Sequence, residues 1–113
     1  MVADFRPLLV FLVLFILIDG AMLAYVIYKH ERVHAHVAEY FGYSPGDVVF
    51  RGGAISQSVG VPVSELNTPK YWAYLAAQSS VDAVGYHLLM LVPFLSATFA
   101  GVFTWLIERI LTR

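Results

Sequence analysis

The chain has 113 residues, which is enough for one small domain. Hydrophobic residues make up 59% of it and charged residues 13%, against about half and about a quarter in soluble proteins, so we expect lipid to surround much of its surface. A net charge of -1 without any run of Lys or Arg excludes the basic surface that binds nucleic acid. Because there is no cysteine, a metal site would need His, Asp or Glu ligands.

The first predicted element is a membrane-spanning helix at about residues 8–28. This run is apolar except at Asp19 and Gly20, and about 20 apolar residues are enough to cross the hydrocarbon core. Arg6 ahead of an apolar run is also seen in secretory signal peptides, but their apolar segments have only about 7 to 15 residues. We therefore expect a spanning helix and not a cleaved signal.

The segment after this span is predicted to prolong the helix beyond the membrane. Residues 29–41 contain no helix breaker and keep helical spacing, so the helix is expected to continue to about residue 41, where Gly42 stops it.

The remaining loop, residues 43–66, carries turn and strand patterns. Ser-Pro-Gly-Asp at 44–47 predicts a turn. Apolar residues at 48–50 and alternating residues at 54–59 flank an Arg-Gly-Gly break, a pattern that predicts a β-hairpin.

A second long helix is predicted to begin at Pro69, with Thr68 as its N-cap. It is expected to run into a second span at about residues 83–107, where the one ionisable residue is His87 and Pro93 is a candidate kink. The predicted fold class is an all-α membrane protein, with two antiparallel transmembrane helices and a small β-hairpin in the interhelical loop. We expect a single integral membrane domain over residues 1–113, with both termini on one side of the membrane.

The pattern that carries chemistry lies at residues 30–34, which read His-Glu-Arg-Val-His. Two His four residues apart share a helix face and can bind one zinc ion, while Glu31 can take the proton of the attacking water. This arrangement predicts metal-assisted peptide hydrolysis. The alternative interpretation is a polar helix end that lies among lipid headgroups.

Residues 30–35, His-Glu-Arg-Val-His-Ala, are followed by Gly42 and the strand-like residues 48–50. This order resembles the membrane-embedded zincin metalloproteases, the site-2 protease group and its small relatives, over roughly residues 23–59. The resemblance implies a zinc cofactor, His30 and His34 as ligands, Glu31 as general base, and a peptide or membrane-protein substrate. The chain contains no Asn-Pro-x-x-Asp-Gly-like segment, which that group has.

A third metal ligand is sought at the start of the second span, because antiparallel spans place those residues at the depth of the His pair. Gln78, Asp82 and Tyr86 share one helix face by their spacing. Asp82 is the first choice and His87 the alternative, although an acid there also suits a helix start. His36 is expected to point away from the His pair and to be exposed.

Asp19 lies near the middle of the first span, where an unpaired carboxylate is costly. We expect it to face protein and not lipid. It would then relay protons or bind a partner helix, or else be protonated or hydrogen-bonded to Ser96 or Thr98.

Three functions remain open at this point. The first is a small membrane zinc metallopeptidase acting at the membrane interface. The second is a non-catalytic structural or accessory subunit of a membrane assembly or envelope, in which Asp19 and Gly20 support helix packing. The third is a metal-binding or transport accessory that uses His30, His34, His36 and His87 without hydrolysis. Homo-oligomers and larger membrane complexes are compatible with each of them.

Overall fold

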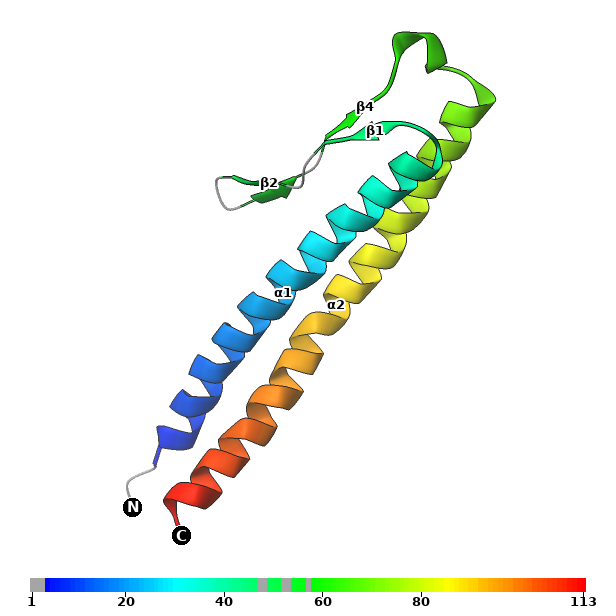
Figure 1. Ribbon diagram of the computed structural model, residues 1–113. Coiled ribbons are helices and arrows are strands. Elements are labelled where there is room, and N and C mark those ends of the chain that lie inside the picture. Colours follow the sequence, from blue (N-terminus) through cyan, green and yellow to red (C-terminus); the bar gives the residue numbers. More distant parts are fainter. Residues whose placement is uncertain (1–3, 47–48, 52–53, 57) are drawn as a thin grey trace. The chain divides into compact units, whose positions relative to one another are not determined.

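The computed structural model describes residues 4–46, 49–51, 54–56 and 58–113. Two long helices pack antiparallel, and short strands and a 3-10 helix connect them (Figure 1). In chain order the elements are α1 (Arg6–Tyr40), β1 (Ser44–Pro45), β2 (Val49–Arg51), β3 (Ala54–Ser56), β4 (Val59–Gly60), η1 (Val63–Glu65) and α2 (Pro69–Leu111). The predicted fold class is confirmed.

The chain divides into two compact units, residues 1–24 with 89–113 and residues 25–88. Both α1 and α2 contribute to each unit. The first unit contains the most apolar helix segments, and the second contains the loop and the candidate metal ligands.

In the first unit, α2 presents a row of buried residues at four-residue spacing. Val92, Ser96, Ala100 and Thr104 are all buried, and Ser96 Oγ lies 3.6 Å from Met22 Sδ on α1. In lipid no hydrophobic force drives two helices together, so their association depends on close van der Waals packing. Small side chains along one helix face permit this close approach. This row is therefore the packing surface of α2 in the first unit.

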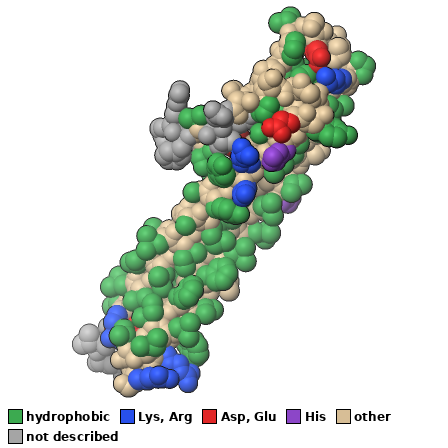
Figure 2. Space-filling model, in the orientation of Figure 1, with side chains coloured by type: hydrophobic (Ala, Val, Ile, Leu, Met, Phe, Trp, Pro, Cys, Tyr) green, Lys and Arg blue, Asp and Glu red, His purple; other side chains and the backbone are tan. Residues whose placement is uncertain are grey.

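The outer surface of the first unit is strongly apolar. Both helices are long and apolar enough to cross a membrane, and none of the most apolar stretch of α1 is buried. Hydrophobic side chains cover the helices, and Lys and Arg side chains gather at the end that carries the termini (Figure 2). There Arg6 Nη2 lies 2.7 Å from Glu108 Oε2, so the start of α1 and the end of α2 meet.

Asp19 is half-buried in the first unit. Its Oδ1 atom is covered and has no hydrogen-bond partner among the residues that the structure describes. Ser96 donates to Met22 and Thr98 donates to the Phe94 carbonyl, so the expected hydrogen bond from either hydroxyl to Asp19 is not formed. Gly20 is exposed and has open space around it, so it makes no close contact with another described part of this chain.

The second unit begins where α1 leaves the apolar segment, and the predicted stop at Gly42 is confirmed. α1 ends at Tyr40, and Gly42 has a φ of 80°, which glycine adopts without steric cost. The Tyr43 amide donates to the Ala38 carbonyl at 2.9 Å and the Gly42 amide to Glu39 at 2.9 Å, the bond pair of a Schellman motif.

This helix end is anchored by a small aromatic core. Ala38, Tyr43 and Tyr74 are buried together, and the rings of Tyr43 and Tyr74 meet edge to face at 4.9 Å between centroids. Half-buried residues from α1, β4 and α2 surround them. The core therefore holds the end of α1 against the start of α2 within the second unit.

The predicted hairpin is confirmed for β2 and β3, but its second strand ends at Ser56, and Val59 belongs to β4, which pairs with β1. β2 and β3 are antiparallel, with Val49 opposite Ser56 and Phe50 opposite Ile55. Val48 and the two glycines of the break lie outside the described residues.

The predicted turn at 44–47 is wrong in its first half. Ser44 and Pro45 form β1, which pairs with β4 so that Ser44 lies opposite Gly60. The Gly46 amide continues the pairing by donating to the Ser58 carbonyl at 2.6 Å. The partner strand, about fifteen residues away in the chain, overrides the local turn preference; Asp47 lies outside the described residues.

The predicted start of α2 is confirmed. The Tyr71 amide donates to Thr68 Oγ1 at 3.2 Å, as an N-cap requires, and Pro69 is the first helical residue. α2 then continues through Pro93 to Leu111 as one helix.

Candidate metal centre

The centre starts from two histidines that α1 places one turn apart. His30 and His34 are separated by four residues, so their side chains leave the same helix face. Their rings meet edge to face with centroids 4.6 Å apart, and the two Nε2 atoms are separated by 3.0 Å. Both side chains are mostly buried, with 16% and 14% of their surfaces exposed. The pair is therefore held between protein elements within the second unit.

Asp82 on α2 completes the group. Its Oδ1 atom lies 2.7 Å from His34 Nε2 and 2.9 Å from His30 Nε2. One carboxylate oxygen and two imidazole nitrogens thus form a compact triangle that could hold a metal ion. The predicted meeting of these three side chains is confirmed, while their role as ligands stays a prediction.

Gln78, one helical turn before Asp82, makes two contacts with His34. Its Nε2 donates to the His34 carbonyl at 3.1 Å, and this bond turns Oε1 toward His34 Nδ1, which it contacts. An amide oxygen only accepts hydrogen bonds, so Nδ1 carries a proton, and in the neutral ring Nε2 then carries the lone pair. Gln78 therefore orients the ring and selects the tautomer in which His34 Nε2 can bind a metal.

The electrostatics of the triangle call for a positive charge within it. His34 Nε2, in that tautomer, and the Asp82 carboxylate are both acceptors, yet they are 2.7 Å apart. Two lone pairs at this distance repel unless a proton or a metal cation lies with them. Two imidazole nitrogens and one carboxylate oxygen are a ligand set used by catalytic zinc, which keeps its fourth position open. The residues present therefore fit zinc.

A glycine on α2 makes room for this arrangement. A Cβ atom at Gly85 would overlap Nδ1 and Cε1 of the His30 ring. The ring consequently lies directly against the α2 backbone, and any side chain at this position would displace it.

The other titratable residues singled out in the sequence lie outside the triangle. His87, the alternative third ligand, is exposed, and its Nδ1 lies 2.7 Å from the Ala83 carbonyl of its own helix. Tyr86 is exposed although it shares the spacing of Gln78 and Asp82. His36 is exposed as expected, with Nδ1 3.7 Å from Glu39 Oε2. Glu31 is half-buried beside His30 in the chain.

Sequence reasoning located Gln78 on the correct face but gave it no role, and it missed Gly85. Gln78 could have been found from its position one turn before Asp82, because metal-bound histidines need an acceptor for their second nitrogen. No comparable signal marks Gly85, since glycine is frequent in membrane-spanning helices.

Comparison with known proteins adds no assignment. No protein family, curated protein or solved structure matches the chain. The resemblance to site-2 proteases accordingly rests on the residues of the motif itself.

Proposed function

We propose that the protein is a small integral-membrane zinc metallopeptidase that hydrolyses peptide bonds at the membrane interface. In this proposal His30, His34 and Asp82 hold the zinc and Glu31 is the general base. The observation that carries it is the triangle of three lone-pair atoms, all within 3.0 Å of one another, built from two helices. Glu31 directly follows the first of these ligands, as hydrolysis in this motif requires.

The membrane part of the proposal is supported by the surface of the first unit. Its helices are long and apolar enough to span a bilayer, and large hydrophobic side chains such as Ile16, Leu17 and Phe94 are more than 60% exposed. Apolar patches of this extent are rare on soluble monomers.

In the proposed hydrolysis the metal and the protein side chains have different roles. Zinc, when bound, supplies a Lewis acid and lowers the pKa of a bound water to about 7. His30 and His34 present neutral nitrogens, Asp82 adds one negative charge, and Gln78 keeps His34 in the required tautomer. The Glu31 carboxylate accepts the proton of the attacking water and returns it to the leaving amine, as a general base and then a general acid.

Metal content tests this proposal directly. The protein, purified in detergent, stripped with a chelator and reloaded, is expected to hold one zinc per chain by elemental analysis. His34→Ala should abolish stoichiometric binding because it removes one of three ligands. His36→Ala is the matched control, an exposed histidine on the same helix outside the triangle, and should leave zinc content unchanged.

Two outcomes would contradict the proposal. Zinc retained at full stoichiometry by the His34 variant would show that the metal binds elsewhere. Absence of zinc binding by the parent protein would favour the non-catalytic membrane subunit.

A further inference from the structure

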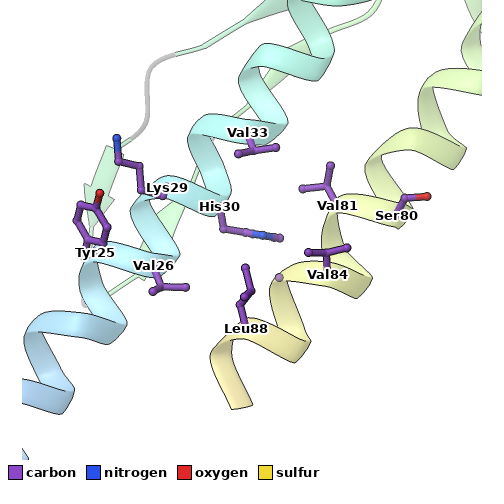
Figure 3. Close-up of a pocket in the computed structure, with 10 residues that line it drawn as sticks. Tyr25, Val26, Lys29, His30, Val33, Ser80, Val81, Val84 and Leu88 are labelled. Carbon is purple, nitrogen blue, oxygen red and sulfur yellow. The ribbon is translucent and has the colours of Figure 1, made fainter. Parts of the chain in front are cut away.

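A pocket of about 430 Å³ adjoins the candidate metal centre (Figure 3). It lies in the second unit, lined by residues of α1 between Tyr25 and Val33 and of α2 between Ser80 and Leu88. A cavity of about 150 Å³ is enough to take up a benzene ring. This pocket therefore has room for the largest amino-acid side chain and part of the adjoining backbone.

The pocket and the metal centre share His30. The His30 ring lines the pocket, while its Nε2 atom lies 2.9 Å from Asp82 Oδ1 in the ligand triangle. Gly85 also lines the pocket and is the position that lets this ring lie against α2. A group that fills the pocket therefore contacts a side chain of the candidate metal centre.

The lining is apolar, which defines the kind of group that it accepts. Valine side chains from both helices and Leu88 of α2 line the space (Figure 3). Among the polar residues of the lining, Ser80 Oγ donates to the Ala76 carbonyl at 3.0 Å, and Lys29 Nζ lies 5.7 Å from the centre of the Tyr25 ring. Most of the lining offers no hydrogen-bonding group, so a polar ligand would lose hydration over most of its surface, whereas an apolar one gains from leaving water.

We propose that this pocket binds a large apolar side chain of the substrate, such as Leu, Phe or Trp, next to the peptide bond that is cleaved. This inference rests on the proposed peptidase function, since the shared His30 is what ties the pocket to the scissile bond. A pocket of this kind makes the enzyme selective for bulky apolar residues. Val84 and Leu88, two exposed pocket residues on α2, determine that selectivity.

The test uses quenched fluorescent peptides that are alanine throughout except for one residue, which is Leu, Phe, Ala or Asp. The parent protein in nanodiscs is expected to cleave the Leu and Phe peptides with kcat/KM at least about tenfold above the Ala peptide, because each apolar carbon in such a pocket contributes about tenfold or more. The Asp peptide should be the poorest substrate.

Two pocket variants then test the assignment. Val84→Phe fills the space, so the kcat/KM advantage of the Leu and Phe peptides over the Ala peptide should be lost when the peptides are compared within the variant itself. Leu88→Ala enlarges the space and should shift preference from Leu toward Phe. Val102→Phe is the matched control, an exposed valine on the same helix that does not line the pocket, and should keep the parent preference.

Equal cleavage of the four peptides, or a preference that survives Val84→Phe, would overturn the pocket assignment while leaving the peptidase intact. If the parent cleaves none of them, the peptidase proposal fails separately. The pocket is then judged by equilibrium binding of the fluorescent Leu and Ala peptides to the zinc-free protein: tighter Leu binding that Val84→Phe removes supports it. The assignment to a substrate side chain would be overturned if peptide binding did not depend on the varied residue and a lipid co-purified with the parent but not with Val84→Phe. Such a result would identify the pocket as an acyl-chain site.

Discussion

At the scale of single residues, the side chains of the candidate metal centre have different roles. Two imidazoles and one carboxylate converge on a point, and a neighbouring amide fixes one of the imidazoles. The glutamate between the two histidines takes no part in the triangle, so binding and turnover can be separated by substitution.

Glu31→Gln separates metal binding from hydrolysis. The amide cannot accept the proton of the attacking water, so turnover should fall by about 10² to 10⁴ while zinc content remains that of the parent. The measurement pairs elemental analysis with cleavage of an apolar peptide. Glu39→Gln, an exposed glutamate on the same helix, serves as control and should retain the parent rate.

Cleavage by the Glu31 variant at the parent rate would show that another group is the base. If parent and variant both bind zinc and neither cleaves any substrate, the metal-binding accessory becomes the better account.

Gln78 should set metal affinity without being a ligand. Gln78→Leu removes the acceptor that keeps the proton on His34 Nδ1, and loss of such a partner typically weakens metal binding by about 10 to 100-fold. Gln78→Glu keeps an acceptor oxygen for Nδ1 but loses the donor to the His34 carbonyl, so it should recover part of the affinity. Competition with a chromophoric chelator measures both, and equal affinities for the Leu variant and the parent would refute the role.

At the scale of the elements, the ends and faces of α1 and α2 determine which parts of the two helices come into contact. The Schellman end at Gly42 and the N-cap at Thr68 fix where the two helices stop and start. The small side chains of α2 at four-residue spacing then set how closely α1 approaches in the first unit.

Ala100 is the residue at which this packing is most easily tested. It is fully buried, so Ala100→Leu would overpack the helix contact, which typically costs about 1 to 3 kcal/mol and should lower Tm in detergent. Gly101→Leu introduces the same side chain at the next position, where a Cβ meets no atom within 4 Å, and should not lower Tm. A drop of the same size in both variants would show that Ala100 is not a packing position.

At the scale of the whole molecule, the two proposed spans would put both termini on one side of the membrane and the loop on the other. The ion pair between Arg6 and Glu108 agrees with adjacent termini. Because the chain has no cysteine, single introduced cysteines report sidedness without background. In sealed vesicles, an impermeant maleimide should label Phe5→Cys and Thr112→Cys from the same side and Ser64→Cys from the opposite side. Labelling of all three from one side would rule out two spans.

The amino-acid sequence by itself determined the features that depend on neighbours along the chain. The length of the apolar runs sets the two long helices, glycine's access to positive φ ends α1 at Gly42, and Thr68 with Pro69 starts α2. Four-residue spacing likewise puts His30 and His34 on one face, because 3.6 residues make one turn.

Only the tertiary structure decided which residues of α2 meet that face. Spacing orders the side chains around one helix, but the rotation and sliding of a second helix against it follow from packing in three dimensions. Gly85 lets the His30 ring lie against α2, and the contact of Gln78 with His34 matches this register. This rotation brings Asp82 to the histidines and leaves His87 exposed, a choice that residue spacing left open. The pairing of β1 with β4 has the same origin, since each two-residue strand is stable only with a partner from across the loop.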